Sequence, residues 1–243
     1  TGTLDPAATG MLPLCFGEAT KVCAYLLDAD KIYRVTARLG VATDTGDVDG
    51  RETVTAQIPT LNRHDWEKLL IGFCGDIEQV PPMYSALKQG GKRLYALARK
   101  GKIVERQPRK IRIHDINLLE VCGQRLVFRV HCSKGTYVRT LVEDIAKVAG
   151  TVAHIANLHR ESVGNFRTED MVELLNIERF AGSSPEVFYE YLLPTDEALV
   201  GWPKQEINED AAARFTAGQA VALDIKDNST QTGHVKVYSA HGE

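Results

Sequence analysis

The spacing of the apolar residues changes halfway along the stretch RLVFRVHCSKGTYVRTLVEDIAKVAG, residues 125–150. Leu126, Phe128, Val130 and Cys132 are separated by single residues, which is the two-residue period of a half-buried strand. From Val138 to Ala149 the apolar residues instead follow one face of a helix, which Gly150 closes. The stretch therefore predicts a strand that leads into a helix, with Ser133 or Thr136 as the helix cap.

Similar patterns occur on both sides of this stretch. Helical spacing covers Glu18–Asp28 and Trp66–Phe73, and strand alternation covers Tyr33–Leu39 and begins again at Ile111. Cys122-Gly123-Gln124 reads as a hairpin turn. Strands and helices interleave, with hairpins and without a regular βαβ repeat. This order favours an α+β fold around a mainly antiparallel sheet.

The composition is that of an ordinary globular protein. The chain has 243 residues, of which 44% are hydrophobic and 25% charged, enough for one large domain with or without a small appendage. No apolar run is long enough to cross a bilayer, so we expect no membrane association. The five cysteines lack Cys-x-x-Cys spacing, and the histidines, with His154 and His159 closest, lack the spacing of a metal site. We therefore expect a cytoplasmic protein without a metal.

Positive charge is concentrated in one segment, although the net charge of the chain is −3. Between Lys88 and Arg112 there are ten basic residues and one acid, Glu105. An average charged run is a solvated helix face, but such a face normally carries interspersed acids. A local field of this kind attracts phosphates even on an acidic protein. The segment therefore predicts a nucleic-acid contact.

The first ten residues place one carboxylate, Asp5, in a loop that is rich in Gly and Thr. Pro6 keeps Asp5 out of the helical region, and Gly2 and Gly10 permit tight turns on either side. Asp-Pro in a turn is usually only a turn. With no second acid beside it, however, Asp5 suits the role of a lone nucleophile or a fixed charge.

Five separated motifs occur together in this chain. They are Thr1–Asp5, Lys31–Val35, Glu78–Lys88, Cys132–Thr140 and Ala153–Arg160. In this order and with these gaps, the chain closely resembles the bacterial tRNA pseudouridine synthase B family, from Thr1 to about Thr195. The resemblance implies a pseudouridine synthase fold and an isomerase that converts the T-loop uridine of tRNA, conventionally numbered 55, to pseudouridine. It implies the T-stem-loop as partner, no cofactor, and a monomer without a protein partner.

The same resemblance assigns roles to single residues. Asp5 matches the family's catalytic aspartate and Arg139 its active-site arginine, which would keep Asp5 ionised. Tyr33 and Tyr137 match tyrosines that contact the flipped uracil, and Leu158 matches the leucine that closes the uracil pocket. The basic segment, about residues 82–109, corresponds to the RNA-clasping insertion. The residues expected on the RNA backbone are Lys88, Lys92, Arg93, Lys100, Lys102 and Arg109.

The resemblance also predicts the domain organisation. Residues 1–195 correspond to the catalytic domain, and residues 196–243 to part of a small β-rich domain similar to the RNA-binding PUA module. The family pattern around the aspartate begins before Thr1, so we expect this chain to lack the family's N-terminal strand and helix and to stop within the C-terminal domain.

Two other classes of function compete with the isomerase. A catalytically idle tRNA-binding or tRNA-folding protein would need only the basic segment and the PUA-like tail. The presence of both Asp5 and Arg139 favours the enzyme. A carboxylate glycosidase needs two acids across the bond, and no second acid accompanies Asp5 in a matching motif.

Overall fold

The computed structural model of the chain describes residues 2–181, 186–223 and 233–240. These residues divide into two compact units. The first unit comprises Thr1–Cys15 and Leu26–Glu173, and the second comprises Phe16–Tyr25 and Leu174–Glu243. All the expected site residues belong to the first unit.

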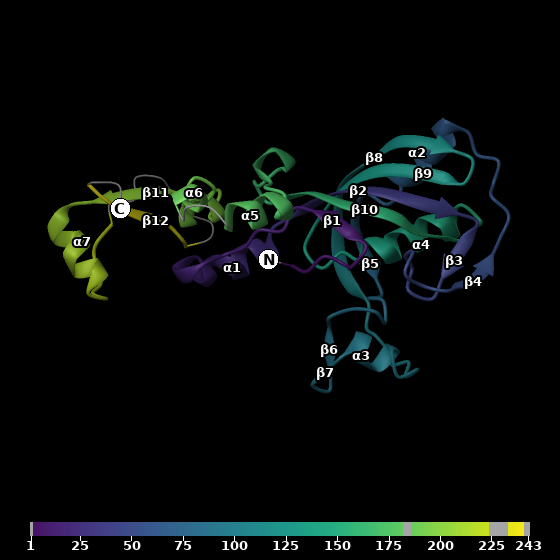
Figure 1. The fold of residues 1–243 in the computed structure, drawn as a ribbon, viewed down its shortest axis with the longest axis horizontal. Coiled ribbons are helices and arrows are strands. Elements are labelled where there is room, and N and C mark those ends of the chain that lie inside the picture. The colour runs from purple at the N-terminus through teal and green to yellow at the C-terminus, as the bar shows by residue number, and fades with distance from the viewer. Residues whose placement is uncertain (1, 182–185, 224–232, 241–243) are drawn as a thin grey trace. The chain divides into compact units, whose positions relative to one another are not determined.

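Six strands form the central sheet of the first unit, in the order β1-β10-β2-β9-β8-β5 (Figure 1). Their bounds are Ala8–Gly10 (β1), Lys31–Leu39 (β2), Gly75–Gln79 (β5), Arg109–Cys122 (β8), Arg125–Cys132 (β9) and Ala153–Val163 (β10). Neighbouring strands are antiparallel except β1, which runs parallel to β10. The expectation of an α+β fold around a mainly antiparallel sheet is confirmed.

The alternation of side chains along β2 and β9, which the sequence predicted, gives the sheet two different faces. Val35, Ala37 and Leu39 of β2 and the matching residues of β9 are buried in the main core. Helices α2 (Arg63–Ile71) and α4 (Val138–Val148) contribute to the same core through the residues Trp66, Leu70, Leu141, Val142 and Ile145. The alternate residues of β2 and β9, including the arginines, therefore lie on the opposite face.

The hairpin expected at Cys122–Gln124 joins β8 to β9, with Cys122 paired to Arg125. A second, smaller pair of strands, β3 (Val41–Thr43) and β4 (Glu52–Thr55), brackets the loop expected between Thr43 and Gly50. The basic segment forms β6 (Lys88–Gln89), β7 (Lys92–Arg93) and α3 (Leu94–Ala98). These three elements stand apart from the central sheet, beyond the end of β5 (Figure 1). The 3-10 turn η2 (Thr168–Asp170) follows β10.

The second unit is made of short elements. They are η1 (Gly17–Val22), α5 (Leu174–Ala181), α6 (Glu186–Tyr189), η3 (Thr195–Ala198), β11 (Lys204–Ile207), α7 (Glu209–Thr216) and β12 (Lys236–Ser239), and α1 (Cys23–Asp28) crosses the division between the units. Strands β11 and β12 pair in parallel. Asn208 caps α7 by accepting a hydrogen bond from the Ala211 N–H at 2.9 Å. None of the helices in the described ranges is long and apolar enough to cross a membrane.

Candidate active site

Asp5 and Arg139 are 134 positions apart in the sequence and meet in the structure. Arg139 donates a hydrogen bond from Nη2 to Asp5 Oδ1 at 3.2 Å. Its Nε lies 2.9 Å from Asp5 Oδ2, an ion-pair contact without hydrogen-bond alignment. The guanidinium therefore faces both carboxylate oxygens, an arrangement that arginine can make and lysine cannot. The fold brings together the two residues expected to carry the chemistry.

The surroundings fix the Arg139 guanidinium in place. The residue is only 6% exposed. Its Nη2 also donates to the Tyr84 carbonyl at 2.8 Å, and its Nη1 donates to the Thr45 carbonyl at 3.0 Å. Burial and these fixed hydrogen-bond partners keep the guanidinium in one position. It therefore holds the Asp5 carboxylate at a defined position.

A second carboxylate reaches the same guanidinium. Asp47 Oδ2 lies 3.7 Å from Arg139 Nη1, and Asp47 is 8% exposed. The expectation that Asp5 stands without a second acid is therefore wrong. The carboxylate of Asp47 also accepts hydrogen bonds from the Thr45 hydroxyl at 2.6 Å and from the Asp49 N–H at 3.2 Å. Because these contacts occupy Asp47 inside its own loop, it suits a positioning role beside Arg139.

Burial raises the pKa of Asp5 above its ordinary value of 3.8. The Arg139 charge opposes this rise, and the negative charge of Asp47 adds to it. The attraction of Arg139 therefore does not fully offset the removal of the Asp5 carboxylate from water. A carboxylate of this kind is more basic than an exposed aspartate, which suits a group that must attack or accept a proton.

The side chain of Gln79, the last residue of β5, holds the start of α4 in place of a capping residue. Its N-cap residue is Tyr137, whose side chain makes no capping bond, so the expectation of a Ser133 or Thr136 cap is wrong. The Thr136 hydroxyl donates to the Ser133 carbonyl instead. The Gln79 amide accepts from the Tyr137 N–H at 2.7 Å and donates to the Tyr137 carbonyl at 3.1 Å. Gln79, 2% exposed, thereby sets the position of Arg139 two residues further along.

The loop that carries Asp5 is attached to β10 through β1. Gly10 adopts φ +105°, and a Cβ there would lie 2.2 Å from the Arg160 carbonyl oxygen, so only glycine fits. The Arg160 side chain is 2% exposed and donates to the carbonyls of Met11 at 2.6 Å and Gly2 at 2.9 Å. One buried arginine thus ties both ends of the Asp5 loop.

The residues expected to contact uracil lie in the same region. Leu158 is 8% exposed and lines a small cleft together with Asp5, Asp47 and Arg139. Burial raises the pKa of the Tyr33 and Tyr137 phenols, so both remain protonated hydrogen-bond donors near neutral pH. The negative charge of Asp5 adds to the rise in the pKa of both phenols, and the positive charge of Arg160 opposes the rise at Tyr33. The structure brings Tyr33, Tyr137 and Leu158 close to the Asp5–Arg139 pair.

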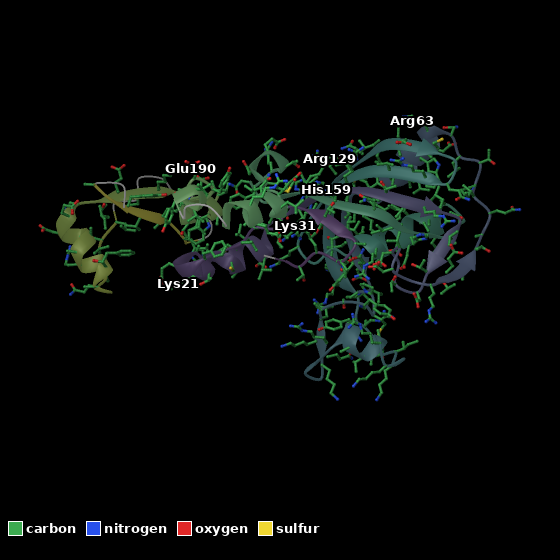
Figure 2. All side chains as sticks on the ribbon, viewed as in Figure 1. Lys21, Lys31, Arg63, Arg129, His159 and Glu190 are labelled. Atoms are coloured by element: carbon green, nitrogen blue, oxygen red, sulfur yellow. The ribbon has the colours of Figure 1, made fainter. Side chains whose placement is uncertain are left out.

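The residues expected on the RNA backbone lie outside this cleft. Lys88, Lys92 and Arg93 are on β6 and β7, Lys100 and Lys102 follow α3, and Arg109 begins β8. All six are exposed, and none forms an ion pair with a carboxylate in the described part of the chain. Figure 2 shows nitrogen-tipped side chains pointing outward from this segment.

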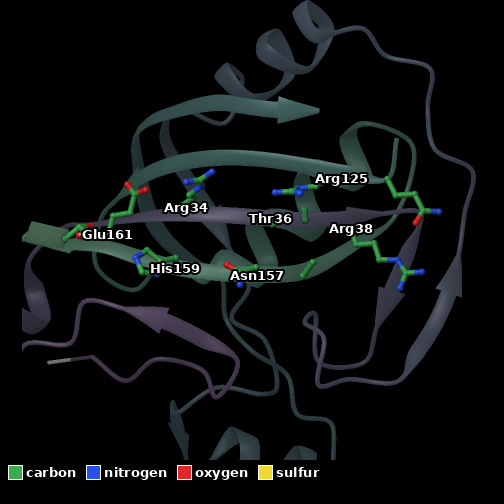
Figure 3. Close-up of a pocket in the computed structure, with 11 residues that line it drawn as sticks. Arg34, Thr36, Arg38, Arg125, Asn157, His159 and Glu161 are labelled. Atoms are coloured by element: carbon green, nitrogen blue, oxygen red, sulfur yellow. The ribbon is translucent and has the colours of Figure 1, made fainter. Parts of the chain in front are cut away.

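Another hollow in the first unit is larger than this cleft. A shallow hollow of about 770 Å³ lies on the outer face of the sheet, between β2, β9 and β10. Arg34, Arg38 and Arg125 line it with Asn157 and other residues (Figure 3). Arg38 pairs with Glu52 and Arg125 with Glu120 across its rim. This wide, open surface lacks the Asp5–Arg139 pair, so the smaller cleft is the candidate active site.

Sequence reasoning missed four supporting residues. Asp47 lies in a segment rich in Asp, Thr and Gly that reads as an ordinary loop, and Gln79 lies in the motif Glu78–Lys88 with no role assigned to it. Ser85, 4% exposed, lies near the Tyr137 phenol. Arg160 ends the motif Ala153–Arg160, but its burial, which is unusual for an arginine, is visible only in the structure. Their partners are distant in sequence, so spacing alone contains no signal for them.

Comparison with solved structures gives the same fold. The chain superposes on the solved structure of a Cbf5–Nop10–Gar1 complex with a TM-score of 0.69, 27% identity, and coverage of 98% of this chain and 65% of that one. A second match, an H/ACA RNP bound to a substrate RNA containing 2′-deoxyuridine, gives a TM-score of 0.68 at 25% identity and covers 98% and 64% of the two chains. The chain spans about two thirds of the length of these structural relatives.

Comparison of sequences defines the class. Residues 1–138 match the TruB family pseudouridylate synthase N-terminal domain, and residues 139–200 match the tRNA pseudouridylate synthase B C-terminal domain. With this fold and these matches, the chain is a pseudouridine synthase, an isomerase.

Curated relatives agree at high identity. A tRNA pseudouridine synthase B of Nitrosococcus oceani is 48% identical over 92% of this chain and 72% of its own length. The Pseudomonas aeruginosa protein of the same name is 49% identical over 91% of this chain and 73% of its own length. The chain belongs to the TruB family of pseudouridylate synthases.

Proposed function

We propose that this chain converts the T-loop uridine of tRNA, conventionally numbered 55, to pseudouridine, with Asp5 as the catalytic carboxylate. The observation that carries the proposal is the Asp5–Arg139 pair in a cleft lined by Leu158. The curated relatives are tRNA pseudouridine synthases, which supports tRNA as the substrate.

The reaction is an isomerisation that balances within one nucleotide. The N1–C1′ bond breaks, the uracil turns, and C5 bonds to C1′. The hydrogen on C5 leaves as a proton, and N1 gains one. Asp5 acts at the ribose or the base during this exchange, either by attacking C1′ or C6 or by taking a proton from C2′. Arg139 holds the carboxylate in place and partly offsets its loss of hydration.

The detached uracil must be held while it turns. Tyr33 and Tyr137 offer aromatic faces for stacking and protonated phenols for hydrogen bonding, and Leu158 closes the pocket. Moving the target uridine out of the tRNA elbow costs about a few kcal/mol in lost stacking. Contacts between tRNA and the rest of the protein must supply this energy.

The basic segment is the proposed source of that binding energy. Its exposed lysines and arginines would neutralise backbone phosphates and release their counterions. We also propose that residues 196–243 begin a PUA-like RNA-binding domain, of which residues 224–232 and 241–243 lie outside the described part of the structure. We place the protein in a reducing cytoplasm, acting as a single chain, in keeping with its five free cysteines.

Tritium release from a T-stem-loop RNA labelled at C5 of uridine tests the proposal. Formation of the C5–C1′ bond must release this label, so we expect release from the parent chain. The matched RNA with cytidine at position 55 and labelled uridine elsewhere should release none. A catalytically idle tRNA-binding protein would instead bind both RNAs and release tritium from neither, and that result would overturn the proposal.

A further inference from the structure

Three potential metal ligands meet on the face of the sheet opposite the main core. His114 Nε2 lies 3.0 Å from Asp30 Oδ2, and His131 Nε2 lies 3.8 Å from the same oxygen. One ligand atom from each residue lies within 4.8 Å of the other two. The two imidazole rings are 4.5 Å apart between centroids. Because the three residues come from separate places in the sequence, their spacing contains no metal-binding motif.

The fold brings these side chains together through a β-bulge. Strand β8 pairs Ile113 with Cys132 and Asp115 with His131, so His114 is the extra residue between them. A bulge of this kind redirects a side chain, and here it turns His114 towards His131 on β9. His131 is paired with Ile32 of β2 on its other side, and Asp30 directly precedes that strand. The three ligands therefore come from β8, β9 and the turn that leads into β2.

The backbone turn that carries Asp30 is fixed by hydrogen bonds without a bound ion. Asp30 lies in this turn, between α1 and β2, where its carbonyl accepts the Gly164 N–H at 2.9 Å. The buried ammonium of Lys31 ties the same turn by donating to the carbonyls of Leu26, Leu27 and Ala29. A preorganised turn lowers the entropy lost when its side chain binds an ion.

The kinds of ligand atom and the distances between them indicate which ion the site would bind. We propose that Asp30, His114 and His131 form a binding site for a divalent transition-metal ion of the Zn²⁺ type. Ligand atoms about 2.1 Å from a tetrahedral Zn²⁺ are about 3.4 Å apart, close to the 3.0 and 3.8 Å found here. Two imidazoles and one carboxylate suit Zn²⁺, Co²⁺ or Fe²⁺, whereas Mg²⁺ and Ca²⁺ prefer oxygen ligands alone.

This site stabilises the fold and takes no part in the isomerisation. His131 alternates with the core residues Val130 and Cys132, so it points to the face opposite the main core. A bound ion would join the α1–β2 turn to β8 and β9. Because the ion binds only when this turn and the two strands are folded together, it should raise the temperature of unfolding. The site does not depend on the proposed substrate.

The test uses the untagged protein after removal of metal with a chelator. Titration calorimetry with Zn²⁺ should show one site in the parent, and Co²⁺ should give the visible absorption bands of a site with nitrogen and oxygen ligands. We expect His131→Ala and His114→Asn to weaken Zn²⁺ binding by about tenfold or more, the scale of losses at metal centres. His64→Ala, on the exposed surface of α2, is the matched control and should bind like the parent.

The unfolding temperature gives an independent measurement. Zn²⁺ should raise it in the parent and in His64→Ala, but not in His131→Ala or His114→Asn, while Mg²⁺ should leave all four unchanged. Circular dichroism without metal establishes that the variants are folded, which the partial exposure of both histidines favours. Equal Zn²⁺ binding by the parent and both site variants would overturn the proposal. Absence of binding by the folded parent would overturn it too, and would show that the cluster is only an Asp–His hydrogen-bonded pair.

Discussion

The Asp5 carboxylate is influenced by two neighbouring charges, the Arg139 guanidinium and the Asp47 carboxylate. Arg139 contacts both oxygens of Asp5, while Asp47 contacts the same guanidinium from another side. Burial remains the largest influence and keeps the pKa of Asp5 above its ordinary value. The residue is therefore held in place without being made strongly acidic. Its chemistry depends on position and charge together, and the two can be separated by substitution.

Replacing Asp5 by Asn should abolish isomerisation and leave tRNA affinity nearly unchanged. The amide keeps the size of the side chain but removes the negative charge, and phosphate contacts elsewhere provide most of the affinity. We expect the single-turnover rate to fall by roughly a thousandfold or more, as for loss of a catalytic nucleophile. Tritium release and filter binding measure the two quantities. Turnover at the parent rate would exclude Asp5 from the chemistry.

The pH dependence should report the raised pKa of Asp5. Activity that needs ionised Asp5 declines as the pH falls through that pKa, which lies above the ordinary 3.8. Asp47→Asn removes a negative charge that raises this pKa, so the acidic limb of the single-turnover profile should move to lower pH. The maximal rate should also fall, because the Arg139 guanidinium is then held less firmly.

Asp44→Asn is the control for this shift, because Asp44 lies in the same loop and accepts from the Arg51 N–H instead. Its profile should match that of the parent. A limb that moves to higher pH in Asp47→Asn, or equally in both variants, would contradict the assignment.

Among the secondary-structure elements, β1 and α4 decide whether Asp5 and Arg139 meet. The Asp5 loop is fixed where β1 runs beside β10, and Arg139 is fixed where Gln79 holds the first turn of α4. Neither attachment uses a residue of the Asp5–Arg139 pair itself. Damage to either element should therefore disrupt the site indirectly.

Gly10→Ala should detach the catalytic loop. The new Cβ would lie 2.2 Å from the Arg160 carbonyl oxygen, at a backbone φ that L-residues rarely adopt. Overpacking and backbone strain together should cost about 3 kcal/mol or more in the free energy of unfolding. Gly91→Ala shares a positive φ but meets nothing within 4 Å, so it should cost only about 1–2 kcal/mol. Urea unfolding compares the two, and equal losses of stability would show that Gly10 is not held against β10.

Gln79→Ala should displace the first turn of α4. It removes two hydrogen bonds to the Tyr137 backbone, which should lower the free energy of unfolding by about 1–3 kcal/mol. The single-turnover rate should fall as well, because Arg139 follows Tyr137 by two residues. Gln124→Ala, in the exposed β8–β9 turn, is the control and should change stability by less than about 0.5 kcal/mol. Unchanged rates in both variants would show that Arg139 is positioned without Gln79.

On the scale of the whole molecule, the basic segment and the hollow on the sheet both present positively charged side chains. Between Lys88 and Arg109, the basic segment presents cations without carboxylate partners in the described structure, whereas the hollow on the sheet presents Arg38 and Arg125 already paired with acids. A free cation gains more from a phosphate than one that must first give up a carboxylate. The basic segment should therefore dominate electrostatic binding of tRNA.

The salt dependence of tRNA binding distinguishes the two surfaces. Alanine at Lys92, Arg93, Lys100 and Lys102 should weaken binding of all tRNAs and flatten the log–log salt slope by about 0.7–0.9 for each phosphate that is no longer neutralised. The uridine that is modified should stay the same, because the residues of the cleft determine which uridine is recognised. Alanine at Arg34, Arg38 and Arg125 is the comparison and should leave the slope nearly unchanged. A larger effect from this second set would move the RNA interface to the sheet.

The sequence alone determined the parts of this protein that depend on local patterns. The alternation in Arg125–Cys132 and the helical face after Val138 predicted β9 and α4, because backbone geometry converts a two-residue or helical period directly into a buried face. The five motifs led to the family and to Asp5 and Arg139 as candidates. The concentration of charge from Lys88 to Arg112 was also visible without coordinates.

The tertiary structure decided which distant residues share a site. Asp47 joined Arg139 because the β3–β4 loop lies over the start of α4, and Gln79 replaced the expected cap because β5 ends beside Tyr137. The bulge in β8 brought His114 to His131 and Asp30. Hydrogen bonds and ion pairs depend on separations of a few ångströms in space, and chain spacing does not specify these until the strands have paired. For that reason the second carboxylate, the helix cap and the proposed metal site emerged only from the fold.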